Sequence, residues 1–316
     1  MRQAERRQGP IVQRTVKSDV RFDGVGLHSG RPARMVIRPA TAEQGIWFHR
    51  TDVEGDGLIA ARWDSVEPSA LCTRITNRSG ASVSTIEHVM AALAGTGIHN
   101  ALIEIDGPEV PILDGSSAPF VRALLARGAR RLPAPVRALE VRRPVRVETD
   151  AGWAELAPSE SFTVAFHIDF PDVAIGKQDL SLDLSNGAFV RELCDARTFC
   201  RQADVAAMRA AGLALGGSMR NAVVVEGDRV LSPGGLRRAD EAVRHKMLDA
   251  VGDLALAGGP LLGRYTGYRA GHALTNMLLR KLFATPGAVR MVSCDPERAA
   301  HLPGVGADLS EMPAVA

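Results

Sequence analysis

The chain has 316 residues, of which 46% are hydrophobic and 23% charged, and its net charge is +2 at pH 7. This length allows two domains of ordinary size, and the composition is typical of a globular protein. The small net charge and the 4% aromatic content argue against nucleic acid as a partner, since nucleic-acid-binding proteins favour basic surfaces and base-stacking rings.

Neither membrane insertion nor secretion is indicated. No apolar run reaches the length of a membrane span, so we expect no stable membrane insertion. Residues 1–10 are Arg-rich and lack the apolar core of a signal peptide, and we interpret them as a solvated, flexible leader. The cysteines form no CxxC pair and predict no disulfide framework, which favours a reducing cytoplasm. They are Cys72, Cys194, Cys200 and Cys294.

The first half of the chain predicts strands and two helices. Short strand-like runs separated by turns rich in Gly and Pro are expected at residues 18–22, 33–38, 45–49 and 100–106, the last with a hairpin return at 110–113. Residues 82–95 predict a helix with a Ser/Thr start and a Gly stop. A second helix opens at residues 116–119, with Pro119 in its first turn, and ends near Gly128.

Residues 130–135 (RRLPAP) are the best linker candidate, because the residue before each Pro is pushed toward extended geometry. A boundary near residue 134 gives domains at residues 11–134 and 135–316. In the second half, strands are expected at residues 139–148, 154–156, 162–170, 222–226, 229–232 and 261–268, and helices at 193–208, 209–212, 243–253 and 273–283.

Each half therefore ends with helix, strand and helix after a run of strands. His88 and His245 occupy equivalent places in the two halves, and we interpret this correspondence as an internal duplication. Strands gathered before helices favour α+β layers over an alternating parallel sheet.

The segment around His245 carries the strongest chemical signal. His245 and Asp249 are four residues apart, so they share one helical face with Cβ atoms roughly 6 Å apart, and Asp253 lies one turn further on. Apolar residues surround them on nearly every other side, which predicts a buried helix. Buried charges must be compensated, either by a salt bridge with Arg244 or Lys246 or by a metal such as zinc.

Two further positions have both a structural and a chemical interpretation. Ser84 and Glu87 fit a capping box, in which Glu87 would only cap the helix. His88 is either a satisfied core histidine or a third metal ligand, and two His with one carboxylate are typical of a hydrolytic zinc site, with Glu87 as its base. His272, at a strand-to-helix junction, is either a helix-start residue or a general acid with a near-neutral pKa.

Several motifs together resemble the zinc-dependent UDP-3-O-acyl-N-acetylglucosamine deacetylase family of lipid A biosynthesis. They occur in order at residues 24–30 (GVGLHSG), 84–88 (STIEH), 111–116 (PILDGS), 196–199 (ARTF), 215–218 (LGGS), 243–249 (VRHKMLD) and 271–274 (GHAL). The match runs from about residue 11 to 300, and motifs of this length are very specific in combination.

The resemblance implies an α+β fold of two similar domains, each a β-sheet with a pair of helices, with the helices sandwiched between the two sheets. It implies that Zn²⁺ is held by His88, His245 and Asp249. It further implies catalytic roles for Glu87 as general base, His272 as general acid, Asp253 as the residue that orients His272, and Thr198 at the oxyanion. The implied substrate contacts are Lys246, Phe166 under the uracil, Phe199, and Leu27 near the mouth of the acyl passage.

The implied reaction is amide hydrolysis of UDP-3-O-[(3R)-3-hydroxyacyl]-N-acetylglucosamine, which releases acetate, by a protein that we expect to be a monomer. Two alternatives stay open at this point. A zinc hydrolase could act on another acetylated sugar. A non-catalytic nucleotide-sugar binder is the second alternative, but it should have lost one of Glu87, His88, His245 or Asp249, and all four are present.

Overall fold

A computed structural model describes residues 11–314 of the chain. The leader predicted at residues 1–10 lies outside the described residues.

The first sheet is built from five strands of the N-terminal half. Their order across the sheet is β2 (Val20–Val25), β3 (Pro32–Pro39), β9 (Ala101–Ile105), β4 (Ile46–Arg50) and β5 (Leu58–Ala60). The β9–β4 pair is parallel and the other pairs are antiparallel. In β9 the side chains of Ala101, Ile103 and Ile105 are buried and the intervening ones are half-buried, so the period of two directs one face toward the core.

The second sheet repeats this plan with strands of the C-terminal half. Its matching strands are β12 (Val145–Thr149), β13 (Gly152–Ala157), β19 (Leu261–Tyr268), β14 (Phe162–Asp169) and β15 (Lys177–Asp183). Again the central strand β19 is parallel to one neighbour, β14, and the other pairs in this set are antiparallel. This shared topology supports the internal duplication. Two more strands, β11 (Arg137–Val141) and β20 (Val289–Ser293), extend the second sheet.

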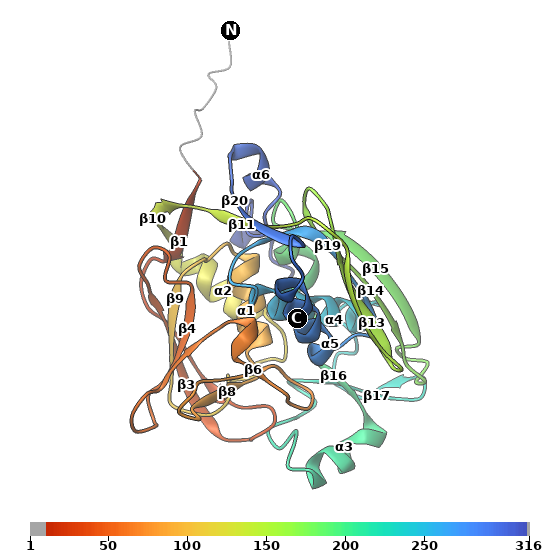
Figure 1. The fold of residues 1–316 in the computed structure, drawn as a ribbon. Coiled ribbons are helices and arrows are strands. Elements are labelled where there is room, and N and C mark those ends of the chain that lie inside the picture. Colours follow the sequence, from red (N-terminus) through yellow and green to blue (C-terminus); the bar gives the residue numbers. More distant parts are fainter. Residues whose placement is uncertain (1–10, 315–316) are drawn as a thin grey trace.

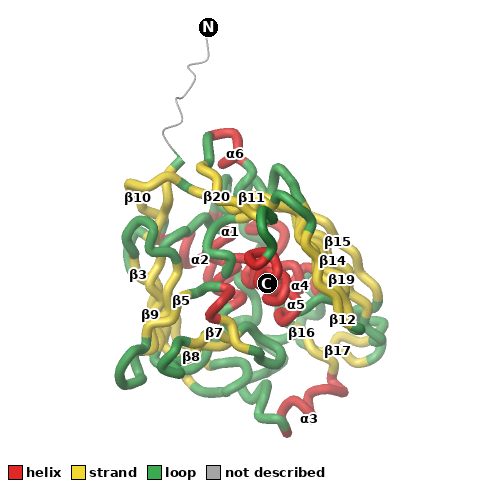
Figure 2. The backbone as a smooth tube through the Cα atoms, viewed as in Figure 1, coloured by secondary structure: helices red, strands yellow, loops and turns green. Residues whose placement is uncertain are grey.

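Four helices lie between the two sheets (Figures 1 and 2). They are α1 (Glu87–Gly95), α2 (Ala118–Arg127), α4 (Glu241–Ala255) and α5 (His272–Ala284). The expected α+β architecture with sandwiched helices is therefore confirmed. The large hydrophobic core includes Leu93 of α1, Val121 of α2, Leu254 of α4 and Leu278 of α5, so the helices are held by apolar burial on the sheets. Among the described residues, no helix has the length and apolarity needed to cross a bilayer.

Shorter elements complete the described part of the chain. The strands are β1 (Val12–Val16), β6 (Val66–Glu67), β7 (Arg74–Thr76), β8 (Ser82–Ser84), β10 (Ala129–Pro135), β16 (Phe199–Arg201), β17 (Val223–Glu226) and β18 (Arg229–Val230). The helices are α3 (Gln202–Ala210), α6 (Pro296–Ala300), the 3₁₀-helices η1 (Trp63–Ser65) and η3 (Leu309–Glu311), and the π-helix η2 (Phe189–Leu193).

Several local predictions were wrong, mostly because tertiary pairing overrode local signals. The predicted linker at residues 130–135 is strand β10, which pairs with β1. Such an edge strand tolerates Pro133 and Pro135 because its free side needs no N–H donor. The helix expected at residues 82–95 begins only at Glu87, because residues 82–84 form strand β8 against β7.

Three other boundaries also differ. The single strand expected at residues 139–148 is divided between β11 and β12. The helix expected at residues 193–208 is interrupted by β16, which pairs with β17. Residues 110–113 form no hairpin, and instead Pro111 bridges Gly26 while Glu109 bridges Ser84. The boundary near residue 134 stays a prediction.

Candidate active site

Helices α1 and α4 pack closely enough to bring residues of the two halves into one site. Gly252 permits this approach, because a Cβ atom at that position would lie 2.0 Å from the carbonyl oxygen of Glu87. Close-packed interiors do not tolerate such an overlap. The first turn of α1 therefore rests directly on α4.

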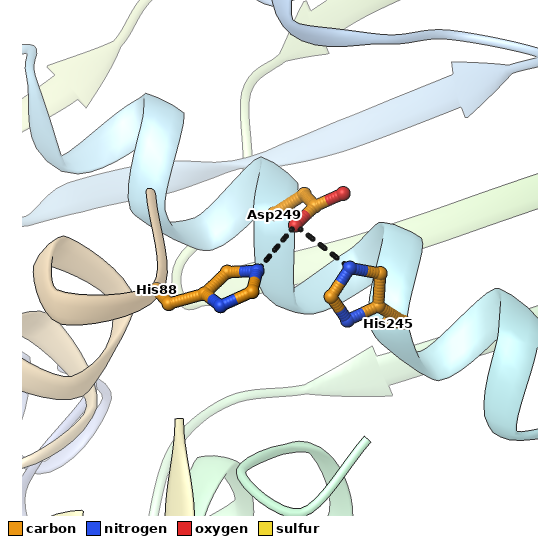
Figure 3. Close-up of side chains that lie close together, drawn as sticks. All are labelled: His88, His245 and Asp249. Atoms are coloured by element: carbon orange, nitrogen blue, oxygen red, sulfur yellow. Dashed lines mark ion pairs between the residues drawn. The ribbon is translucent and has the colours of Figure 1, made fainter. Parts of the chain in front are cut away.

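Three side chains from these helices converge on one point (Figure 3). The Nε2 atoms of His88 and His245 lie 3.6 Å and 3.3 Å from Oδ1 of Asp249. The candidate ligand atoms of the three residues all lie within 4.8 Å of one another, and all three side chains are buried. Oδ1 of Asp249 has no hydrogen-bond partner, and an unsatisfied buried carboxylate oxygen is costly. This trio of two imidazoles and one carboxylate fits a metal ion.

The surroundings of the trio favour the protonation states that a metal requires. Nδ1 of His245 lies 3.1 Å from the carbonyl oxygen of Ala196, and donation there leaves a lone pair on Nε2. Burial lowers the pKa of His245 to about 4, so its ring is neutral near pH 7. Burial alone would raise the pKa of Asp249, but the basic groups His245 and Lys246 hold it well below its usual range. A neutral imidazole and an ionised carboxylate are ready to bind a cation.

Lys246 is the cation nearest to Asp249. Its Nζ donates a hydrogen bond to Oδ2 of Asp249 over 2.8 Å, so the salt bridge considered from the sequence does form, on the oxygen opposite the two imidazoles. Burial would lower the pKa of Lys246, but Asp249 outweighs it and the pKa is raised. The ammonium group is therefore charged and half-buried at the edge of the trio.

Glu87 does not cap its helix. The N-cap residue of α1 is Ile86, which makes no side-chain capping bond, so the capping-box interpretation was wrong. Oε2 of Glu87 instead accepts a hydrogen bond from the Thr73 N–H over 3.0 Å. Burial raises the pKa of Glu87 above its usual range, and a carboxylate with a raised pKa is suited to take a proton near neutral pH.

His272 faces Glu87 across the site. Its Nε2 lies 4.0 Å from Oε1 of Glu87 and 4.0 Å from Oδ2 of Asp249. Its Nδ1 lies 2.8 Å from Oδ2 of Asp253, whose other oxygen accepts from the Thr73 hydroxyl. Burial by itself would lower the pKa of His272, but the Asp253 and Glu87 carboxylates outweigh it and raise the pKa to about 9. The imidazole is thus held as a cation beside the trio.

Phe199, one of the expected substrate contacts, lies near this site, whereas the roles of Thr198 and Leu27 stay predictions. The Phe199 ring lies 6.1 Å from the His245 ring, centroid to centroid. The backbone of Thr198 is fixed by its N–H, which donates to the Gly115 carbonyl oxygen over 2.8 Å. Leu27 is half-buried in a loop whose carbonyl groups accept from Leu215 and Gly216 of the other half.

Phe166 is placed differently. Its side chain is 4% exposed, and its ring packs 6.2 Å from the Tyr265 ring and against the backbone of Gly267. This core position gives no support to base stacking, and that role of Phe166 stays a prediction. Phe170, the residue after the end of β14, is half-buried, and its ring lies 5.3 Å from the Phe199 ring, centroid to centroid.

Sequence reasoning missed two residues that complete the cluster. Thr73 binds both Glu87 and Asp253, and the Ala196 carbonyl oxygen lies beside His245. Nothing in the local sequence of Thr73 marks this role, because its partners are far along the chain.

The structure also has a cavity of about 300 Å³ that is lined by residues such as Trp47 and by none of the expected site residues.

Comparison with known proteins decides the family. The family model described as UDP-3-O-acyl N-acetylglycosamine deacetylase matches residues 13–284. The chain belongs to this family. It is 49% identical over 289 residues to the UDP-3-O-acyl-N-acetylglucosamine deacetylase of Shewanella sp. (strain W3-18-1), covering 91% of this chain and 94% of that protein. It is 51% identical over 282 residues to the deacetylase of the same name from Phenylobacterium zucineum (strain HLK1), covering 89% and 96%.

The resemblance inferred from the motifs is therefore confirmed. Members of this deacetylase family are generally metalloenzymes, and the chain holds a His/Asp group able to bind a metal, formed by His88, His245 and Asp249.

Proposed function

We propose that this chain is a zinc-dependent deacetylase that removes acetate from UDP-3-O-[(3R)-3-hydroxyacyl]-N-acetylglucosamine in lipid A biosynthesis. The observation that carries the proposal is the convergence of His88, His245 and Asp249, with Glu87 and His272 on either side. The near full-length similarity to deacetylases of that name supports the substrate. A non-catalytic binder has no use for such a complete set of groups.

Zinc is the metal that best fits the donor set. His88 and His245 would supply two nitrogen ligands and Asp249 one oxygen ligand, which is a three-ligand pattern typical of catalytic zinc. When bound, the ion would polarise the substrate carbonyl and make water more acidic. The hydrogen bond between His245 and the Ala196 carbonyl oxygen would orient that ligand.

Two residues are proposed to move the protons. Glu87, with its raised pKa, accepts a proton from the water that attacks the acetyl carbonyl. His272, held as a cation by Asp253, donates a proton to the amine as the amide C–N bond breaks. Asp253 acts through His272, whose Nδ1 it binds, so that Nε2 carries the proton offered to the leaving group. The products are acetate and the free glucosamine.

Other residues would hold the substrate and the developing charge. Thr198 is proposed to stabilise the oxyanion, and one donor of this kind is worth roughly 3 kcal/mol. Lys246, charged at the edge of the trio, is proposed to contact the anionic part of the substrate. Phe199, whose ring lies beside His245, and Leu27 are proposed to contact the substrate, and Phe170 supplies a half-buried ring beside Phe199.

We also propose a cytoplasmic location. All four cysteines are free, and three of them are buried, which fits a reducing compartment. The monomeric state stays a prediction that a solution mass measurement would test.

The proposed function is tested by metal analysis together with an acetate-release assay. We expect one zinc per chain and acetate release from UDP-3-O-acyl-N-acetylglucosamine, and a series of acyl-chain lengths would define the preferred substrate. UDP-N-acetylglucosamine without the acyl chain and other acetylated sugars serve as controls. Equal turnover of those controls would favour a deacetylase of another sugar. The absence of acetate release from UDP-3-O-acyl-N-acetylglucosamine would contradict the proposal.

A further inference from the structure

Glu109 is a buried carboxylate that the proposed mechanism does not use. Only 2% of the residue's surface is exposed. Oε1 accepts hydrogen bonds from the His28 N–H over 2.8 Å and from the Thr85 hydroxyl over 2.9 Å, and Oε2 accepts from the Ser29 N–H over 2.8 Å. Three donors on one buried carboxylate make a strong, directional junction. The junction joins two separate segments of the N-terminal half.

The first of these segments is the loop of residues 24–30. A Cβ atom on Gly26 would lie 2.2 Å from Oε2 of Glu109, so the loop closes around the carboxylate only with glycine there. Burial lowers the pKa of His28, the Glu109 carboxylate opposes that shift, and His272 and His88 lie near enough to lower the pKa further. The loop therefore lies beside the catalytic cluster. Its position is set by the two N–H groups that Glu109 binds.

The second segment leads into α1. Thr85 has a φ of +57°, a left-handed conformation that is sterically unfavourable for a β-branched residue. Such strained residues persist when their surroundings hold them, and they gather at functional sites. Here the Thr85 hydroxyl is held by Glu109. Thr85 lies two residues before Glu87 and three before His88, so its conformation sets where both side chains start.

We propose that Glu109 is a positioning residue for the deacetylation. Through Thr85 it fixes the first turn of α1, and through the loop of residues 24–30 it fixes the wall of the substrate site. The inference rests on the proposed function, because it assigns Glu109 to the same reaction. It assigns no contact between Glu109 and the substrate or the metal.

Two substitutions of Thr85 test the link without disturbing Glu109. Thr85→Val keeps the β-branched shape and removes the hydroxyl, whereas Thr85→Ser keeps the hydroxyl. We expect Thr85→Val to weaken zinc affinity about 10–100-fold, the range typical when a residue supporting a metal ligand is lost, and to lower kcat. Thr85→Ser should restore both. Zinc affinity is measured by chelator competition without substrate, and kcat and KM by acetate release.

Thr96 offers a matched control at the other end of α1. It is also buried, and its hydroxyl donates to the Ala92 carbonyl oxygen over 2.7 Å. Thr96→Val makes the same hydroxyl-to-methyl change at the C-cap of α1. We therefore expect some loss of Tm with unchanged zinc affinity, kcat and KM. This control separates general weakening of α1 from loss of its position at the site.

Thr85→Gly distinguishes positioning from simple structural support. Glycine adopts positive φ freely, so this variant relieves the steric cost while losing the hydroxyl. We expect an unchanged or raised Tm together with lower zinc affinity and kcat. In Glu109→Gln, adding Thr85→Val should cause little further loss, because both changes break one shared link.

Wild-type zinc affinity and kcat in both Thr85→Val and Thr85→Gly would overturn the positioning role. If the unmodified protein released no acetate from any substrate, the proposed function would fail, while the zinc affinities of the same variants would still decide whether Glu109 and Thr85 position the site.

Discussion

Nδ1 of His272 lies 2.8 Å from Oδ2 of Asp253, while Nε2 of the same ring lies 4.0 Å from Oε1 of Glu87. The hydrogen bond to Asp253 engages one nitrogen and directs the other toward the centre of the site. Asp253 is held in turn by the Thr73 hydroxyl. One carboxylate thus sets both the orientation and the charge of the imidazole.

This relationship predicts the basic limb of the pH profile of kcat/KM. As a general acid, His272 must be protonated, so activity is lost as pH rises through its pKa. Neighbouring carboxylates raise that pKa from 6.5 to about 9, and a cation bound by the trio would lower it again by repulsion. We expect the basic limb between these two values. Measured profiles of Asp253→Asn should show the limb at lower pH, with slower turnover and full zinc content.

The His272→Ala variant provides the decisive comparison for the general acid. Without an imidazole to deprotonate, the basic limb should flatten and turnover should fall about 10²–10⁴-fold. A basic limb that kept its position in this variant would show that another group controls it, and the acid role of His272 would have to be abandoned.

Glu87 is expected to control the acidic limb. Its pKa is raised by burial, so the ionised base is lost as pH falls through a value above the usual 4.5 for glutamate, although the apparent pKa belongs to the coupled group of neighbours. Glu87→Gln should keep its zinc and lose about 10²–10⁴-fold in kcat. Zinc content, Tm and turnover are measured on one preparation. Near-normal turnover with a lowered Tm would mean that Glu87 is structural only.

The ligand assignment predicts that His245→Ala loses both metal and activity. Removing this ring leaves only His88 and Asp249 as protein ligands. We expect zinc to fall well below one equivalent per chain and acetate release to fall by at least about 10²-fold. His99→Ala is the matched control, since His99 binds the Arg14 N–H away from the trio. A full equivalent of zinc in His245→Ala would rule out the assignment.

Gly252 predicts a cost for any side chain at the crossing of α1 and α4. Gly252→Ala places a methyl group 2.0 Å from the Glu87 carbonyl oxygen, so the helices must separate. Overpacking typically lowers the free energy of unfolding by about 1–3 kcal/mol, whereas replacing glycine by alanine within a helix raises it by roughly 1 kcal/mol. With so close a contact, we expect the overpacking cost to be the larger of the two. We expect a lower free energy of unfolding and slower turnover. In Gly259→Ala the nearest atom, the Arg137 carbonyl oxygen, is 3.6 Å away, and neither quantity should change.

Local periodicity was sufficient for the parts of the site that belong to one element. His245, Asp249 and Asp253 share a helical face because the turn of an α-helix sets that spacing whatever surrounds it. The alternating strand around Phe162 was predictable for the same reason, whereas the α+β layering was predicted from the order of strands before helices. The family motifs added the other residues by resemblance, and the structure brought Glu87, His88 and His272 to the same place.

Tertiary structure alone decided the partners of these residues. Thr73 meets Glu87 and Asp253, and Glu109 meets Thr85 and His28, through hydrogen bonds between segments that are distant in the sequence. The Pro-rich segment at residues 129–135 became a strand because β1 was available to pair with it. Such outcomes depend on how the two sheets close over the helices. Hydrogen-bond and steric complementarity between distant segments has no periodic signature in the chain, because no repeat of local geometry produces it.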